Sequence, residues 1–267
     1  EKAITPKTKA IIPVHLFGLA ANMDEVMALA EKHNLYVIED NAQGIGATYT
    51  SKTGQKKMTG GIGHVGSTSF FPSKNLGCYG DGGAIFTNDD DLAHVIRGIV
   101  NHGMYKRYHH DVVGVNSRLD SIQAAVLRAK LPKLDLYNTT RRNTARKYTK
   151  AFAGIQNIIT PTGFCDSSSS ICDTCDCHVF HQYTLQVKNI DRDALVAHLN
   201  ANDIPCGVYY PIPLHLQKAY ADTRYKEADF TVTNTLVKEV VSLPMHTELD
   251  DEQIAFITKT LVDFVTK

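Results

Sequence analysis

The pattern of apolar and polar positions divides the first half of the chain into short strands and helices. Four apolar runs have the length of buried strands: Ala10–Val14, Leu35–Ile38, Val65–Phe70 and Ala84–Thr87. Helical spacing of apolar side chains follows Asn22, a candidate N-cap, and returns over 89–99. Strands that alternate with helices predict a mostly parallel sheet covered on both faces. Ligands bind beyond the carboxyl ends of such strands, so polar residues at those ends are the first candidates for chemistry.

The second half of the chain predicts a smaller α+β domain. A long helical region, 119–152, is interrupted by Pro132, which predicts a kink or a break between two helices. After a loop rich in Ser and Cys, apolar patterns indicate further strands and helices, at Val179–Val187, Arg192–Asn202, Cys206–Tyr210 and from Asp250 onward, where Gln253 completes a capping-box pattern. We place the boundary near Asn138: residues 1–138 form part of a large domain and residues 139–267 form a small C-terminal domain.

Composition narrows the class of protein. Hydrophobic residues make up 43% and charged residues 21% of the chain, which argues against disorder and coiled coil. The 28 basic and 28 acidic residues cancel, so broad binding to nucleic acid or to an anionic membrane is not expected. No apolar run approaches the roughly 18 residues of a membrane span. With no export signal in the sequence given, we expect reduced cysteines and a cytoplasmic protein.

One lysine stands in a glycine-rich stretch directly after a predicted strand. Lys74 lies among small and aromatic residues, with four glycines just downstream. Burial in a tight loop would lower the pKa of its amine and favour Schiff-base chemistry. An exposed lysine in a flexible turn is an equally good interpretation of this segment alone.

A carboxylate stands at the end of another predicted strand. Asp40 follows Leu35–Ile38, where a buried charge is costly unless it is paired. A protonated pyridine nitrogen would be a suitable cationic partner. A helix N-cap or a loop salt bridge is the alternative, and the segment alone favours that alternative.

Together, these segments resemble the DegT/DnrJ/EryC1/StrS family of pyridoxal-phosphate sugar aminotransferases. The motif EDNAQ at 39–43 is followed by TSFFPSKNLGCYGDGGA at 68–84. Further matches run through the chain in order: PVHLFG at 13–18, NHG at 101–103, VGVNSRLD at 113–120, YPIPLHLQ at 210–217 and SLPMH at 242–246. The resemblance implies an α/β fold of the aspartate aminotransferase type (fold type I), and it is strongest for enzymes that aminate nucleotide-linked 3-oxo sugars.

The resemblance also implies roles for individual residues around the cofactor, pyridoxal 5'-phosphate. Lys74 matches the Schiff-base lysine, and Asp40 matches the carboxylate on the pyridine nitrogen. Gln43 matches a residue beside the ring, and Ser69 matches a phosphate-binding hydroxyl. Asn116 matches an asparagine that reaches the phosphate from a neighbouring subunit, which implies a homodimer with a shared site.

Three further residues are candidates for the substrate side. Tyr210 matches a residue that touches the sugar nucleotide, Arg118 is either structural or substrate-binding, and His15 follows a strand and could approach the cofactor. A hydrogen-bonded structural histidine is an equally good interpretation of His15. Tyr209 departs from the histidine that relatives often carry, which leaves the sugar open.

No metal site is expected. The cysteines from Cys165 to Cys177 are spaced C-x6-C-x2-C-x-C, which is not the paired C-x2-C pattern of structural zinc sites. The family's chemistry needs no metal either.

The resemblance implies transfer of an amino group, with glutamate as donor, to a keto-sugar nucleotide (3-oxo or 4-oxo). Relatives carry a further stretch before the point where this sequence starts, so we expect a fragment that binds the cofactor weakly and turns over poorly or not at all. Three alternatives stay open: a catalytically silent cofactor-binding fragment, a sugar dehydratase, in which the lysine is replaced by histidine, and, more remotely, a DNA-binding regulator.

Overall fold

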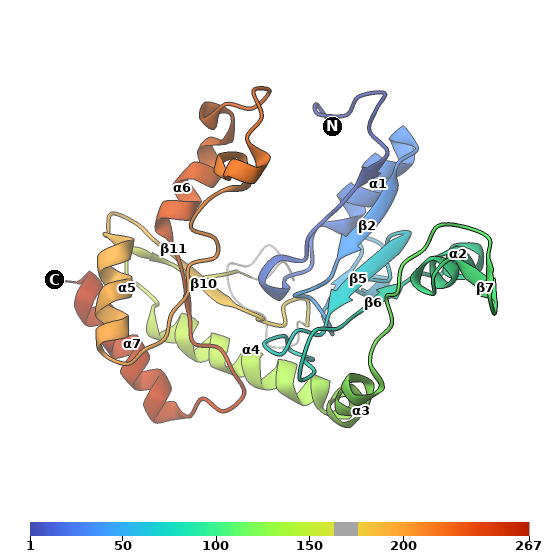
Figure 1. Cartoon of the computed structure of the whole chain (residues 1–267). Helices are drawn as coiled ribbons and strands as arrows, with labels where there is room; N and C mark the ends of the chain where they lie inside the picture. Colours follow the sequence, from blue (N-terminus) through green and yellow to red (C-terminus); the bar gives the residue numbers. More distant parts are fainter. Residues whose placement is uncertain (163–175, 267) are drawn as a thin grey trace. The chain divides into compact units, whose positions relative to one another are not determined.

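A computed structural model describes residues 1–162 and 176–266 of the chain. By their internal contacts, these residues form two compact units. The first contains Glu1–Thr139 and residues 176–181, and the second contains residues 140–162 and 182–266. Figure 1 shows the elements of each unit along the chain.

The first unit is built on a four-stranded sheet in the order β1-β2-β5-β6. Its strands are β1 (Ala10–Ile11), β2 (Tyr36–Asp40), β5 (Val65–Ser69) and β6 (Gly83–Phe86). The first three run parallel, and β6 runs antiparallel to β5. In the parallel pair β2–β5, Asp40 lies opposite Ser67, so the carboxyl ends of these two strands meet at the same edge of the sheet.

Helices and two hairpins complete the first unit. Helix α1 (Met23–His33) packs its apolar stripe, Met23 and Ala30, against Leu35 and Val37. The remaining elements are η1 (Leu16–Gly18), β3 (Thr48–Thr50), β4 (Lys56–Met58), α2 (Asp90–Val100), β7 (Met104–Lys106), β8 (His109–His110), α3 (Ser121–Lys130) and η2 (Leu131–Lys133). Helix α4 (Leu134–Ala151) begins in this unit and continues into the second.

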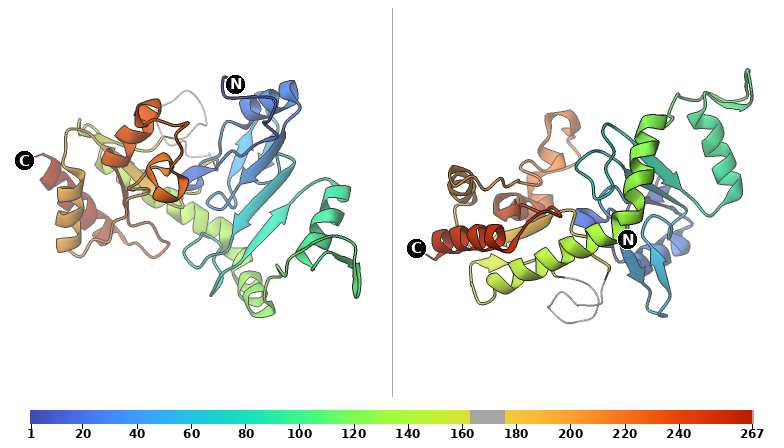
Figure 2. Two further views of the ribbon diagram at one scale, coloured as in Figure 1. Left: turned by 45° about the horizontal axis from the view of Figure 1, so that its top comes forward. Right: turned by 90° about the horizontal axis from the view of Figure 1, so that it is seen from below.

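The second unit has a three-stranded antiparallel sheet in the order β11-β10-β9. Its elements are β9 (Ile158–Ile159), β10 (Tyr183–Val187), α5 (Arg192–Ala201), η3 (Leu214–Leu216), η4 (Lys218–Tyr220), η5 (Glu227–Phe230), α6 (Thr231–Glu239), β11 (Val240–Leu243) and α7 (Asp251–Val265). Helices α5 and α7 lie side by side, as Figure 2 shows. Their buried residues Leu195, Leu199 and Leu261 form part of the core.

Several predictions of local structure are confirmed. The sheet of the first unit is mostly parallel. Pro132 lies in the short η2 turn that separates α3 from α4, because proline cannot continue the helical hydrogen bonds. The side chains of Asp250 and Gln253 form the predicted capping box at the start of α7.

Other predictions of local structure are confirmed only in part or are wrong. Asn22 takes the predicted N-cap position of α1, but its side chain makes no capping bond and instead accepts a hydrogen bond from the Tyr49 hydroxyl. The strand predicted at Cys206–Tyr210 is reduced to a single bridge between Gly207 and Ser242. The apolar run that starts at Val179 forms a strand only from Tyr183, because residues 178–181 are buried in the first unit.

Candidate active site

The loop between β5 and β6 presents Lys74. Its two ends are held together by hydrogen bonds of 2.8 Å, from Phe70 N–H to Gly82 O and from Cys78 N–H to Phe70 O. A side chain at Gly77 would be impossible here, because a Cβ would lie 2.4 Å from the carbonyl oxygen of Pro72. The glycines therefore make the loop compact.

Asn75 anchors this loop to the first unit. Its buried side-chain amide donates to Asn138 Oδ1 at 2.8 Å and to Val179 O at 3.0 Å, and its Oδ1 contacts His181 Nδ1 at 3.3 Å. A buried amide with these partners fixes the backbone locally. The side chain of Asn75 therefore holds the backbone next to Lys74 in place. The sequence alone did not predict this role of Asn75.

The charge of the Asp40 carboxylate acts on the amine of Lys74, although the two groups form no salt bridge within the described residues. Burial lowers the pKa of the half-buried Lys74, and the negative charge of Asp40 raises it by a smaller amount, so the pKa is lower than usual. These two residues come from segments 34 positions apart in the sequence, and the pairing of β2 with β5 brings them together. The structure thus joins the two strongest candidates from the sequence.

The carboxylate of Asp40 is held on one side only. Its Oδ1 accepts the N–H of Ala42 at 3.0 Å, and its backbone N–H and C=O bond to Pro13 O and His15 N–H. Among the residues that the structure describes, Oδ2 accepts no hydrogen bond. This oxygen is therefore open to a cationic partner.

Gln43 and Ser69 lie at the same strand ends. Gln43 Oε1 accepts the N–H of Phe17 at 2.5 Å, and Ser69 Oγ accepts the N–H of Phe71 at 3.2 Å. A hydroxyl that accepts one hydrogen bond keeps its own O–H to donate. The Ser69 hydroxyl could thus donate to an anionic oxygen.

His15 has the contacts of a structural histidine. Its ring is fully buried at 0% exposure, Nδ1 accepts the N–H of Ala21 at 3.0 Å, and Nε2 lies 2.8 Å from Glu39 Oε2. Both ring nitrogens are engaged within the chain. This geometry contradicts the expectation that His15 binds substrate and supports the structural alternative.

Glu39, which the sequence analysis did not single out, is the partner of His15. Its carboxylate is also 0% exposed and accepts three backbone N–H groups besides, from Gly60 at 2.7 Å, Ile62 at 2.7 Å and Gly63 at 2.6 Å. Burial raises the pKa of Glu39, but these four hydrogen bonds outweigh burial and lower it. The alternation of side chains along β2 was the available signal, since Glu39 and Asp40 point to opposite faces.

The remaining candidates come from other segments of the chain. Asn116 and Arg118 are exposed neighbours in the segment after β8, joined by a 3.0 Å hydrogen bond from Arg118 Nε to Asn116 Oδ1. Tyr210 belongs to the second unit, where its side chain is exposed.

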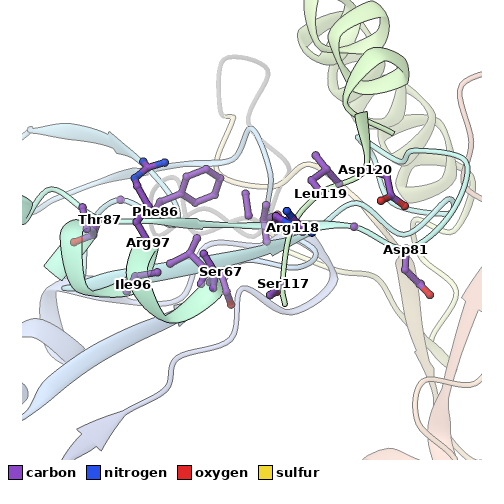
Figure 3. Close-up of a pocket in the computed structure, with 18 of the residues that line it drawn as sticks. Ser67, Asp81, Phe86, Thr87, Ile96, Arg97, Ser117, Arg118, Leu119 and Asp120 are labelled. Atoms are coloured by element: carbon purple, nitrogen blue, oxygen red, sulfur yellow. The ribbon is translucent and has the colours of Figure 1, made fainter. Parts of the chain in front are cut away.

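A large cavity lies beside β6 and α2. Its volume is about 990 Å³, and its lining includes Ser67, Phe86, Arg97 and Arg118. Figure 3 shows these side chains around it. Neither Lys74 nor Asp40 lines this cavity, although residues 81–82 of the Lys74 loop do.

Within the described residues, no group of three or more His, Cys, Asp or Glu side chains has the arrangement of a metal site. Cys165, Cys172 and Cys175 lie outside those residues, so the prediction for the cysteine cluster stays a prediction. Across the same part of the chain, no helix is both long enough and apolar enough to cross a membrane.

Known proteins resemble this chain over nearly its whole length. The pleiotropic regulatory protein of Geobacillus stearothermophilus is 44% identical over 99% of this chain. The UDP-N-acetyl-3-dehydro-alpha-D-glucosamine 3-aminotransferase of Acidithiobacillus ferrooxidans is 46% identical over 98% of it. The structure of S. venezuelae DesV matches with a TM-score of 0.89 at 37% identity and covers 100% of this chain and 67% of DesV.

The two curated relatives are longer than this chain, which spans 67% and 66% of their lengths. The profile of one family matches residues 1–262. This confirms the family and the fold type that the sequence motifs predicted. The chain belongs to the DegT/DnrJ/EryC1/StrS aminotransferase family.

Proposed function

We propose that this protein is a pyridoxal phosphate-dependent aminotransferase that transfers an amino group from glutamate to a keto-sugar nucleotide. The observation that carries the proposal is that Asp40 and Lys74 follow the same edge of the parallel pair β2–β5, where the charge of Asp40 acts on the half-buried amine of Lys74. The name of the Acidithiobacillus relative supports a 3-oxo sugar as the substrate class. We place the reaction in the cytoplasm.

The residues of the site fit pyridoxal phosphate, which carries an aldehyde, a basic ring nitrogen and a phosphate. Lys74 offers an amine for the aldehyde, and the open Oδ2 of Asp40 offers a negative charge for the protonated ring nitrogen. Ser69 offers a hydroxyl for the phosphate. Asn116 of a second copy would reach the same phosphate, so we propose a homodimer.

Lys74 would hold the cofactor covalently through Nζ and later move protons. When bound, the cofactor withdraws electrons from the amino substrate and so acidifies its C–H bond. Because burial lowers the pKa of Lys74, a larger fraction of its amine is neutral and able to accept a proton at Nζ. The carboxylate of Asp40 would lie at the protonated ring nitrogen, and Gln43 would lie beside the ring.

On the substrate side, we propose Tyr210 and Arg118 as contacts for the sugar nucleotide. Tyr210 is exposed, and the exposed guanidinium of Arg118 offers paired donors that suit a phosphate or a carboxylate. We do not propose His15 as a substrate contact, because its ring is fully buried.

The alternatives have weaker support. A dehydratase would carry histidine in place of Lys74, and this chain has the lysine. A DNA-binding regulator would need positive charge, whereas the net charge is zero. An activity assay distinguishes the enzyme from a protein that binds the cofactor but is catalytically silent.

The test is an amination assay with a panel of 3-oxo and 4-oxo sugar nucleotides. The purified protein is incubated with pyridoxal phosphate, glutamate and each sugar nucleotide, and amino-sugar and 2-oxoglutarate are quantified by mass spectrometry. We expect slow turnover that gives both products in equal amounts with at least one 3-oxo substrate. Cofactor binding without either product across the panel would favour the silent protein.

A further inference from the structure

Glu39 and His15 form a buried polar cluster that the proposed reaction does not use. A buried ionisable pair is costly, and apolar residues of similar volume often stabilise a protein as well or better. Here the carboxylate of Glu39 receives four hydrogen bonds, so the cost of desolvation is offset by a fully bonded geometry. Such a cluster is suited to specifying positions rather than to adding stability.

The tautomer of His15 follows from its contacts. Because Nδ1 accepts the Ala21 N–H, the ring proton lies on Nε2 and is donated to Glu39. The backbone N–H of the same histidine donates to the carbonyl oxygen of Asp40 at 3.1 Å. His15 therefore bonds to two successive residues of β2, with its ring to Glu39 and with its backbone to Asp40.

The same turn also holds Gln43. Phe17, two residues after His15, donates its backbone N–H to Gln43 Oε1. Gly18 leaves no room for a Cβ, which would lie 3.0 Å from the carbonyl oxygen of Gln43. The segment 15–18 thus touches both residues that we propose beside the cofactor ring.

On the other side, Glu39 fixes the loop 60–63. Its Oε1 accepts the N–H groups of Ile62 and Gly63, and its Oε2 accepts that of Gly60. Glu39 is therefore the point where the end of β2, the turn 15–18 and the loop 60–63 are joined.

We propose that Glu39 and His15 are a positioning pair that sets the orientation of Asp40 and Gln43 toward the pyridoxal phosphate ring. The inference rests on the proposed function. It assigns neither residue a contact with cofactor or substrate. Loss of the Glu39–His15 hydrogen bond should therefore alter the bound cofactor before it unfolds the protein.

Two substitutions of His15 give a matched test. In His15→Gln, the side-chain amide can reach the place of Nε2–H and still donate to Glu39, but the acceptor for Ala21 is lost. In His15→Asn, the shorter amide replaces the Nδ1 acceptor for Ala21, but the donor to Glu39 is lost. Each variant removes one hydrogen bond, and only His15→Asn breaks the proposed pair.

The readouts are the melting temperature of the cofactor-free protein, the dissociation constant of pyridoxal phosphate, and the visible circular dichroism of the bound cofactor at saturation. We expect both variants to melt at similar temperatures. We expect His15→Asn to weaken cofactor binding about tenfold and to change the dichroic band, and His15→Gln to stay within about threefold of the unmodified protein. Glu39→Gln, which places an amide N–H against His15, should resemble His15→Asn.

Leu261→Ala is the control for general destabilisation, because it removes buried apolar volume within the second unit. Equal cofactor affinity and an unchanged dichroic band in His15→Asn and His15→Gln would overturn the inference, even if Glu39→Gln fails to fold. If the unmodified protein itself binds no pyridoxal phosphate, the proposed function fails, and the inference fails with it. If the unmodified protein binds the cofactor and the two His15 variants behave alike, only the inference fails.

Discussion

The Lys74 loop and the cavity beside β6 differ in what they offer a ligand. The loop holds an amine of lowered pKa on which the charge of Asp40 acts, and that carboxylate has an open oxygen. The cavity is large, about 990 Å³, and its lining includes two arginines, but neither Lys74 nor Asp40 belongs to it. Reactive side chains say more about the reaction than the volume of a cavity does, because orientation and proton transfer depend on those side chains.

Two neighbouring carboxylates at the end of β2 differ in the same way. Glu39 is fully buried and accepts four hydrogen bonds, whereas Asp40 is partly exposed and its side chain accepts one from the backbone. The saturated carboxylate is suited to holding structure, and the unsaturated one is available to a ligand. This division predicts the largest effects at Lys74 and Asp40 and the smallest at the cavity.

Removal of the amine should abolish the chemistry of the loop. We expect Lys74→Ala to lower the rate of amino transfer by at least about a thousandfold, because the group that binds the cofactor and moves the proton is gone. The matched control is Lys57→Ala on exposed strand β4, which should keep the rate. A Lys74→Ala protein with more than a tenth of the original rate would contradict the account.

Neutralising the carboxylate should have the next largest effect. Asp40→Asn keeps an oxygen that can accept the Ala42 N–H, so the fold should survive. Without the charge near the ring nitrogen, we expect the rate of amino transfer to fall about a hundredfold. The rate at saturating cofactor checks this, and a rate within threefold of the original would argue against contact between Asp40 and the ring.

The same substitution should change the titration of Lys74 in the cofactor-free protein. Burial already lowers the pKa of Lys74, and the charge of Asp40 opposes part of that effect. Loss of this charge should lower the pKa further, so Lys74 should react with an amine reagent at lower pH in Asp40→Asn. Peptide mass spectrometry across a pH series measures this, and a midpoint that stays or rises would contradict the proposed proximity.

Asn75 should matter for stability more than for chemistry. Asn75→Ala leaves the buried partners Asn138 and Val179 without their donor, which we expect to lower the free energy of unfolding by about 2 kcal/mol. Asn88→Ala, which loses a hydrogen bond at an exposed position, is the control and should change it by less than about 0.5 kcal/mol. Denaturant unfolding of the two variants gives the comparison.

The smallest effect is expected at the cavity. Arg118→Ala should raise the KM for the sugar nucleotide about tenfold and leave cofactor affinity unchanged. Arg97 lines the same cavity, and Arg97→Ala should change neither the KM nor the cofactor affinity. A loss of cofactor binding in either variant would show that the cavity and the loop are one site.

Much of this site follows from sequence patterns, and the rest depends on contacts between distant segments. Asp40 and Lys74 could be predicted because each follows a strand, and the family motifs give their proposed roles. Alternation along β2 indicates that Glu39 faces away from Asp40, but its hydrogen-bond partners could not be predicted, since residues 15 and 60–63 are far away in the sequence. Contacts between distant segments also explain two differences in local structure. The side chain of Asn22 bonds to Tyr49 instead of capping its helix, and the strand predicted at 206–210 forms only one bridge.

The Asn138 boundary and the roles of Asn116 and Tyr210 stay predictions. Asn116 depends on a second copy of the chain, and Tyr210 depends on the placement of the second unit. Measuring the oligomeric state in solution, with and without pyridoxal phosphate, would test the role of Asn116.

The central claim is that Lys74 is the amine that binds the cofactor. The direct measurement is to incubate the protein with pyridoxal phosphate, reduce with borohydride and map the labelled peptides by mass spectrometry. The account predicts one dominant pyridoxyl label, on Lys74. A label spread over exposed lysines, or concentrated on any other lysine, would contradict it.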